Sequence, residues 1–467
     1  MNFLKIEKLY YLLILLAGIL AVYIYFFSFL DINYSPYYGD EYFYFKNSES
    51  FYLTNSLKAV FTYSGSGAKI FGADAHGPAY PLIYGSIAKL IGWGGLTIPI
   101  INLGILMLAI LAMIWKNGGS KDTKLLQVIL VLGSPITLFY SVTYLAELLQ
   151  IAGAIGLFIL MQRYLRKEKL HDFIYLIFFI FLLGTIRSTW FFAFFGLVVV
   201  PGPIKGNWKS IYVLVGLALP FAFQHFFHEQ VPNTFSDLGK ITESRQYLVA
   251  FNSIIENLRQ NISYIFTYSD GDFYAMQKVW FYTSLIISIT IFRKDRLILI
   301  GLVILGSIVI FNLFIYKNYS WVDLRMYTPM IIFLNLGIIE NSVKKYPIVI
   351  LLTINLFSFV LILPLQKVIM NYRVPPRMVK IPLKTISEVS KLDTSLIYID
   401  TTLLSNYKII DLPNLNTNNK PIIYILPYYI MDTKKPSHYL VEVIDHSCVK
   451  LIKILNQNIT PKVVCNE

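Results

Sequence analysis

Long apolar runs alternate with short polar stretches along most of the chain. A helix that crosses the hydrocarbon core of a bilayer needs about 17–25 predominantly apolar residues with little charge. About eleven runs fit this description, several of them shortened or interrupted by glycine or proline. The pattern predicts a polytopic α-helical membrane protein with about eleven transmembrane helices. The runs are Leu9–Leu30, Leu96–Trp115, Leu125–Tyr140, Leu148–Met161, Phe173–Ile186, Thr189–Ile204, Ile211–Phe227, Val279–Phe292, Leu297–Tyr316, Thr328–Ile339 and Pro347–Leu363.

The first run follows Lys5 and Lys8, as the apolar core of a signal peptide does. However, this apolar stretch is too long for a signal peptide, and no small-residue cleavage site follows it. We therefore expect an uncleaved membrane anchor with a cytoplasmic N-terminus.

Charge is distributed unequally between the two sets of loops that this topology defines. The N-terminal end and five short loops carry sixteen basic and six acidic residues, whereas the longer loops of the other side carry eleven basic and thirteen acidic residues. Short basic loops face the cytoplasm. An odd number of spans then places the residues after about 365 outside. The chain is thus expected to be a multi-pass protein of a plasma or inner membrane.

The composition agrees with this class of protein. Of 467 residues, 56% are hydrophobic and 14% are charged, whereas soluble globular proteins average roughly 45–50% apolar and about 25% charged residues. A soluble enzyme and an intrinsically disordered protein are therefore excluded. The net charge of +13 could indicate nucleic-acid binding. Because most of the surplus lies in the short cytoplasmic loops, we expect no nucleic-acid partner.

Three long segments are predicted to lie outside: residues 31–95, residues 229–278 and the tail of residues 366–467. Within the first, Ala79–Ile91 is apolar but too short to span, so it is expected to form a helix at the membrane interface. The chain is thus divided into a transmembrane module, residues 1–365, and an extracytoplasmic C-terminal domain.

The tail alternates β-rich runs with turns rich in asparagine, proline and lysine, which predicts a small α/β domain. Its two cysteines, Cys448 and Cys465, are the only ones in the chain. In an oxidising compartment they could form a disulfide, and two buried free thiols are the alternative. The runs are Leu396–Asp400, Ile422–Leu426, Tyr439–Val443 and Val449–Ile454.

The best candidates for catalytic residues are the adjacent carboxylates Asp40 and Glu41, which lie in the aromatic stretch of residues 37–45. Burial and mutual repulsion raise a carboxyl pKa, which suits a general base. A hydrated loop with helix-capping acids is the alternative.

Two further outer positions carry candidate groups. Asp74 and His76 lie in the turn before the interfacial helix, where Asp74 could cap that helix and His76 could donate to an anion at the helix N-terminus. Simple solvation of the histidine is the alternative. Glu147 lies where the third and fourth spans meet outside, and a plain helix-end anchor is its alternative.

Basic residues are sparse on the outer side, where Arg187, Arg325, Arg245 and Lys278 are found. Arginine can bind a phosphate group through two parallel hydrogen bonds. Snorkelling to lipid phosphates is the alternative for all four, and we favour it for Lys278. No acid falls in the middle of a span, which argues against an ion-driven transporter.

Taken together, these residues resemble the GT-C glycosyltransferases, in particular the polyprenyl-phosphate-sugar-dependent branch that includes protein O-mannosyltransferases and the lipid A aminoarabinose transferase. The resemblance covers roughly residues 1–365. The Gly77 position is a frequent proline in that family, and the proline after Arg325 is one residue closer than in the family pattern. The matching elements are Asp40-Glu41, His76-Gly77-Pro78-Ala79-Tyr80, Tyr144 with Glu147, Arg187-Ser188-Thr189, and Arg325 with Tyr327 and Pro329.

The resemblance implies inverting transfer of a sugar from a polyprenyl-phosphate donor to a glycan, lipid or protein acceptor. Asp40 would be the base, and Glu41 would orient the acceptor or tune Asp40. No metal is required, because arginine can neutralise the phosphate, although a divalent cation between Asp40 and Glu147 remains an option. The implied phosphate-binding residues are Arg325, Arg187, His76 and Arg245, and the implied acceptor- or substrate-binding residues are Glu147, Asp74, Tyr80, Tyr144 and Tyr327.

Two other classes stay open. A polymerase or ligase of lipid-linked glycans would share the spans and outer arginines but use a pyrophosphate donor. A transporter or flippase of lipid-linked sugar would move its substrate without forming a glycosidic bond. The sequence does not identify the sugar or the acceptor.

Overall fold

The protein is described from a computed structural model. The described residues are 3–30, 34, 36, 39–55, 57, 78–116, 120–201, 208–227, 247–266, 272–291, 293, 295–315, 321–341, 345–373 and, beyond these, seven strands between residues 378 and 465.

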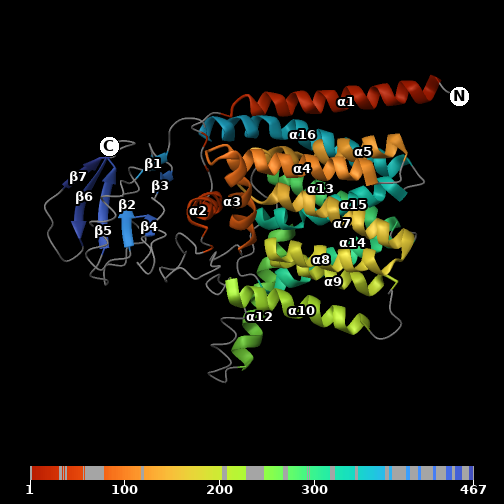
Figure 1. The fold of residues 1–467 in the computed structure, drawn as a ribbon. Helices are drawn as coiled ribbons and strands as arrows, with labels where there is room; N and C mark the ends of the chain where they lie inside the picture. The colour runs from red at the N-terminus through yellow and green to blue at the C-terminus, as the bar shows by residue number, and fades with distance from the viewer. Residues whose placement is uncertain are drawn as a thin grey trace.

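Helices make up the larger part of the structure (Figure 1). Each of the eleven predicted apolar runs falls on helical elements. Within the described residues, five helices are long and apolar enough to cross a membrane, namely α1, α4, α7, α14 and α16. Three shorter apolar helical stretches accompany them, at α8, at residues 188–199 and in α10. The chain is therefore a helical membrane protein.

The elements are α1 (Phe3–Phe27), α2 (Gly39–Thr54), α3 (Ala79–Ile91), α4 (Thr97–Lys116), α5 (Lys121–Leu132), α6 (Pro135–Tyr140), α7 (Glu147–Lys167), α8 (Leu170–Ile186), η1 (Ser188–Phe192), α9 (Ala193–Gly196), η2 (Leu197–Val199), α10 (Trp208–Phe227), α12 (Tyr247–Phe266), α13 (Asp272–Ile291), α14 (Arg296–Ile315), η4 (Trp321–Tyr327), α15 (Thr328–Asn341) and α16 (Lys345–Arg373).

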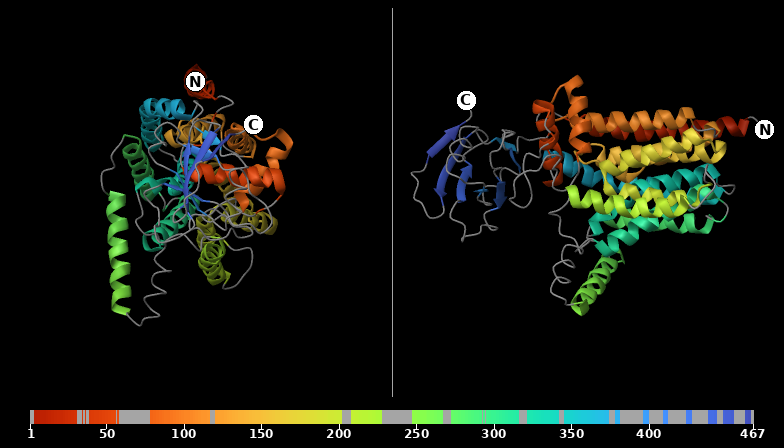
Figure 2. Two further views of the ribbon diagram at one scale, coloured as in Figure 1. Left: turned by 90° about the vertical axis from the view of Figure 1, so that its left-hand side faces the viewer. Right: turned by 60° about the horizontal axis from the view of Figure 1, so that its bottom comes forward.

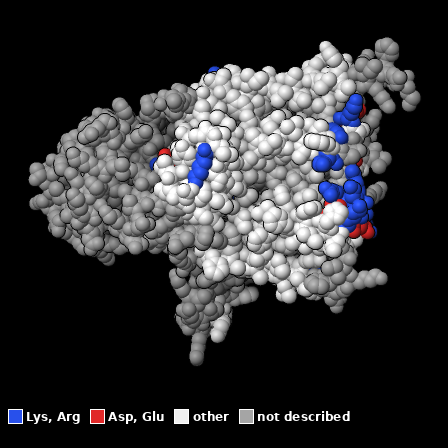
Figure 3. All heavy atoms as spheres, viewed as in Figure 1, with Lys and Arg blue, Asp and Glu red and all other residues white. Residues whose placement is uncertain are grey.

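The two ends of the bundle differ. Most of the visible lysine and arginine side chains gather at the end where the N-terminus lies (Figure 3). The short helices α2 and α3 and the C-terminal strands lie at the opposite end (Figures 1 and 2).

The run predicted as one span at residues 125–140 is divided into α5 and α6 by Pro135. Proline cannot continue a helix, and α5 ends at Leu132, so carbonyls of its last turn have no helical donors. In an apolar environment these carbonyls need other partners. Asn355 Nδ2 donates to Leu130 O at 2.9 Å, and the Tyr23 hydroxyl donates to Leu132 O at 2.9 Å. Side chains of α16 and α1 thus provide hydrogen-bond donors for the carbonyls at the end of α5.

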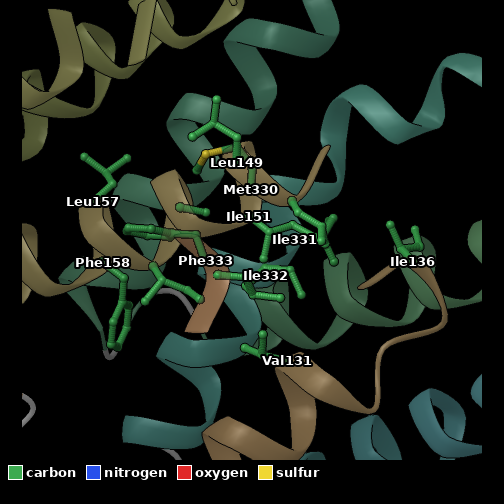
Figure 4. Close-up of a cluster of buried hydrophobic side chains, with 14 of the residues drawn as sticks. Val131, Ile136, Leu149, Ile151, Leu157, Phe158, Met330, Ile331, Ile332 and Phe333 are labelled. Carbon is green, nitrogen blue, oxygen red and sulfur yellow. The ribbon is translucent and has the colours of Figure 1, made fainter. Parts of the chain in front are cut away.

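The core lies where α15 packs against α7 and α5 (Figure 4). Every residue from Thr328 to Ile339 is buried, which explains why this run is apolar on all sides. Close packing with α14 depends on Gly301, where an added Cβ would lie 2.6 Å from Leu334 Cδ2. Labelled core residues are Val131, Ile136, Leu149, Ile151, Leu157, Phe158, Met330, Ile331, Ile332 and Phe333.

The predicted interfacial helix is confirmed as a helix with the expected bounds, Ala79–Ile91. It packs against α2, whose first turn contains Asp40 and Glu41. Because Glu41 is fully buried in a helix, a hydrated loop is the wrong description of this residue.

The C-terminal segment contains a five-stranded sheet of order β4-β2-β5-β6-β7 and a separate parallel pair, β1 with β3. In the sheet, β2 is parallel to β4 and β5, and the pairs β5–β6 and β6–β7 are antiparallel. The four predicted runs fall on β2, β4, β5 and β6, whereas β1, β3 and β7 were not predicted. The strands are β1 (Met378–Lys380), β2 (Leu396–Ile399), β3 (Ile409–Asp411), β4 (Tyr424–Pro427), β5 (His438–Val443), β6 (Cys448–Ile454) and β7 (Lys462–Cys465).

Candidate functional site

A buried turn of residues 141–146 joins α6 to α7 and organises the candidate site. A buried turn must satisfy its backbone groups with side chains, since no helix partner is available. Four successive carbonyls receive such bonds. Val142 O accepts from the Tyr34 hydroxyl, Thr143 O from Asn102 Nδ2 at 3.3 Å, Tyr144 O from the Tyr80 hydroxyl at 2.5 Å, and Leu145 O from Asn102 Nδ2 at 3.1 Å.

Glu41 holds the same turn from α2. Its Oε1 accepts a hydrogen bond from the Tyr144 backbone N–H at 3.1 Å. The Tyr144 hydroxyl in turn lies 2.6 Å from Gly95 O and 3.0 Å from Tyr34 O. Two predicted site residues, Glu41 and Tyr144, are therefore in direct contact, and the contact fixes the position of the turn.

Glu147 follows the turn as the first residue of α7 and is 2% exposed. Arg187 Nη2 lies 3.3 Å and Arg325 Nε 3.7 Å from its Oε1. The three residues are separated widely in sequence, and we refer to them as the carboxylate–arginine cluster. Glu147 Oε2 is buried and has no hydrogen-bond donor within the described part of the chain.

Helix termini favour this arrangement. The N-terminal end of a helix stabilises an anion and the C-terminal end stabilises a cation. Glu147 begins α7, and Arg187 directly follows the last residue of α8, its packing neighbour. Arg187 Nη1 also donates to Gln150 Oε1 at 3.2 Å, one turn along α7 from Glu147.

Three tyrosines of α2 and α3 with closely packed rings lie near the two glutamates. The ring centroids of Tyr44 and Tyr80, and those of Tyr80 and Tyr84, are 4.0 Å apart. Burial raises the pKa of Tyr80 well above 10.0, and the nearby Tyr84, Tyr44, Glu41 and Glu147 raise it further. Tyr80 is therefore a neutral hydrogen-bond donor, and both carboxylates lie near enough to influence it.

The short helix η4, which contains Arg325, borders an apolar groove of about 550 Å³. The neighbours of Arg325 in η4, Leu324 and Tyr327, line this groove together with side chains of α12, α13 and α14. Tyr327 is fully buried, and its hydroxyl accepts from Asn312 Nδ2 at 3.4 Å. The helix that contributes a guanidinium group to the carboxylate–arginine cluster thus also contributes to a surface suited to a hydrocarbon chain.

Several of the predicted site residues are not among the contacts described above. Asp74, His76 and Arg245 lie outside the described residues. Asp40 is placed in the first turn of α2, but its side chain is not described. Lys278 is described, and its predicted snorkelling is wrong: it is 7% exposed and donates to Tyr264 O at 3.1 Å.

Asn102 and Gln150 belong to the site but were not predicted. Both are uncharged residues within long apolar runs, and only charged groups were weighed there. Gln150 lies three residues after Glu147, so helical spacing places both on one face of α7. A polar amide at such a position is the signal that could have identified both residues.

The described residues contain no group of three or more histidine, cysteine, aspartate or glutamate side chains arranged to hold a metal ion. The described groups that could contribute carboxylate ligands here are Glu41 and Glu147. Comparison with protein-family models and with characterised proteins gives no significant match for this chain.

Proposed function

We propose that the chain is a membrane glycosyltransferase that transfers a sugar from a polyprenyl-phosphate donor, with inversion, to an acceptor on the outer face of the membrane. The observation that supports this most is the buried carboxylate–arginine cluster, whose Arg325 belongs to the same short helix as two residues that line an apolar groove. Two guanidinium groups suit a phosphate, and the groove suits the attached hydrocarbon chain.

In this proposal each of the eleven apolar runs crosses the membrane once. The basic end of the bundle faces the cytoplasm, as short basic loops do. The end that carries α2, α3 and the C-terminal strands then lies outside. Donor and acceptor therefore meet on the outer side of the plasma or inner membrane.

Asp40 is the proposed base, which takes the proton of the acceptor as the acceptor attacks the anomeric carbon. As the sugar leaves, negative charge grows on the phosphate, and Arg325 and Arg187 stabilise it. Cationic groups that are already in place before the reaction lower the barrier most. Glu147 keeps both arginines near one point, and Glu41 and Tyr80 position the turn from which Glu147 projects.

The test is transfer from a labelled polyprenyl-phosphate sugar by the purified protein in vesicles. Asp40→Asn should abolish transfer while the protein stays folded, whereas Lys89→Gln, on the same end of the bundle, should retain it. Unchanged transfer by Asp40→Asn would overturn the role of Asp40.

A donor comparison separates the other two functions. Preference for a polyprenyl-pyrophosphate donor would indicate a polymerase or ligase. Movement of labelled lipid across the vesicle membrane without a new glycosidic bond would indicate a transporter. Either result would overturn the proposed reaction.

A further inference from the structure

Helix α12 presents two exposed faces of opposite character. One face is apolar and strongly exposed, with Leu248 77%, Phe251 61% and Phe266 74% accessible, together with the less exposed Ile255 and Ile262. On a helical projection these residues share one arc. The neighbouring arc is polar and also exposed, and it consists of Asn252, Glu256, Arg259 and Ser263.

A third, narrow face attaches α12 to the bundle. Asn257 Nδ2 lies 3.2 Å from Phe314 O, and Asn261 Nδ2 donates to Leu313 O at 2.8 Å. These carbonyls belong to the last turn of α14, where a helix has no internal donors left. The two asparagines therefore cap α14 and hold α12 at the level where α14 ends.

The orientation of α12 differs from that of the bundle helices. It runs across their common direction and stands at the side of the bundle (Figures 1 and 2). Because α14 is one of the helices able to cross a membrane, its end marks the membrane boundary. A helix held at that level and turned across it lies along the membrane surface.

We propose that α12 is an interfacial helix whose apolar face is buried in the outer leaflet and whose polar face contacts water. An amphipathic helix in this position gains the transfer free energy of its apolar face. The occupant is lipid rather than a protein, because the apolar face continues into the groove through Ile262 and Phe266. That groove is also lined by the membrane-crossing α14.

This placement adds a consequence that rests on the proposed function: α12 forms the outer wall along which the donor's hydrocarbon chain reaches Arg325. The placement itself does not depend on catalysis. A measurement of how deeply α12 lies in the bilayer therefore tests this placement even if no sugar transfer is found.

Spin labels at single cysteines provide the test, in protein with Cys448→Ser and Cys465→Ser reconstituted in phosphatidylethanolamine–phosphatidylglycerol vesicles. Labels at Phe251→Cys and Ile255→Cys should collide several-fold more with oxygen than with a water-soluble nickel chelate. The matched control on the polar face, Asn252→Cys, should show the opposite ratio.

A label at Leu108→Cys, an exposed position of α4, serves as the lipid-facing reference and shows that the protein is folded and inserted. Strong collision of the Phe251 and Ile255 labels with the nickel chelate would overturn the proposal, because α12 would then lie in water. Low collision with both reagents would also overturn it, because a protein partner would then cover the face.

A separate observation concerns the two cysteines. Cys448 begins β6 and Cys465 ends β7, and the two are direct partners in the antiparallel register. Opposed residues of such a pair have Cα atoms about 4.5–5.5 Å apart, which lies within the usual disulfide range of about 4.4–6.8 Å. β7 is an edge strand of the sheet, and it is the last strand of the chain.

We infer that Cys448 and Cys465 form a disulfide that fastens this edge strand to β6. In the reaction the two thiols lose two protons and two electrons and form one S–S bond. A thiol–disulfide oxidoreductase of the extracytoplasmic compartment accepts the electrons, and its own disulfide becomes a dithiol.

Alkylation of the denatured full chain with N-ethylmaleimide, without reductant, tests this inference by intact mass. We expect no adduct and a mass lower by two hydrogen atoms, and two adducts after reduction. The Cys448→Ser variant should take up one adduct. Two adducts on the unreduced protein, or a reducible dimer, would overturn the inference.

Discussion

The two ends of the bundle both contain arginine–carboxylate pairs, yet they use them differently. At the basic end, the Arg163 and Arg166 side chains are 40% and 47% exposed where they meet Asp172 and Glu340. At the site end, Arg187 and Arg325 are only 18% and 19% exposed and both meet one carboxylate, Glu147. Exposed guanidinium groups keep much of their hydration, whereas those of the site have lost most of it.

In the proposed function, the exposed pairs belong to the cytoplasmic end and the buried cluster belongs to the catalytic site. Exposed ion pairs contribute about 0–1 kcal/mol to stability. Desolvated ion pairs cost free energy to assemble, and replacing them with apolar residues is often neutral or stabilising. Stability alone therefore gives no reason to bury such a cluster, which agrees with the proposed binding of a phosphate.

The largest effect is expected from Glu147→Gln. Removing the carboxylate leaves two partly buried guanidinium groups without a counter-charge, which should lower the free energy of unfolding by about 3 kcal/mol. SDS-induced unfolding of the detergent-solubilised protein measures this change. Glu340→Gln at the basic end is the matched control and should cost less, because Arg166 can be hydrated. Equal effects would remove the distinction between the two ends.

The next largest effect is on sugar transfer. Arg325→Gln should lower kcat/KM about 100-fold, since a group aimed at developing charge is lost. Arg325→Lys keeps the charge but not the planar guanidinium group, so its kcat/KM should lie between those of the wild type and Arg325→Gln. A normal rate for Arg325→Gln in vesicles would mean that the cluster is structural.

A smaller change is expected from Tyr80→Phe. The Tyr144 carbonyl loses its donor inside the protein, which should cost about 1–3 kcal/mol of unfolding free energy. The sharper check is alkaline pH, because the pKa of Tyr80 is raised in the folded state. The stability due to this group is constant below pH 10.0 and falls above it, where the unfolded chain ionises first. Tyr80→Phe should weaken this alkaline decline, whereas Tyr175→Phe, an exposed tyrosine of α8, should not.

The smallest effect is expected from Arg166→Gln. Arg166 is 47% exposed, and Glu340 keeps the donor Gln127 Nε2 at 3.3 Å, so the change should cost about 1 kcal/mol, and sugar transfer should not change. Thermal unfolding and the transfer assay check both statements. A loss of transfer would show that the basic end is coupled to the site.

Helix content was predictable because a bilayer enforces long apolar runs, and the bounds of α3 follow from an apolar stretch too short to span. The division at Pro135 was not predicted, since it depends on whether Asn355 and Tyr23 can satisfy the freed carbonyls. The outer charged residues near Glu147 could be named from sequence. Their pairing could not, because nothing local relates Arg187 to Arg325.

Strands β1, β3 and β7 were not predicted. β1 and β3 have only three residues each, too few to show a periodicity, and β7 has three apolar residues after a lysine, whereas β2 and β4 overlap five-residue β-rich runs. The predicted snorkelling of Lys278 was wrong because it left out a contact with a distant part of the chain. Its burial depends on the carbonyl of Tyr264 at the end of α12, a helix that was not predicted within the outer loop.

The order of the contacts around the 141–146 turn bears on how the protein is made. Every side chain bonded to its carbonyls, and Glu41 as well, precedes the turn in the chain. Synthesis runs from the N-terminus, so all of these partners have been made before the turn itself. Arg187 and Arg325 arrive later. The residues that hold the turn are therefore made before both arginines, and the pair of Glu147 with Arg325 can form only after the second half of the chain has been synthesised.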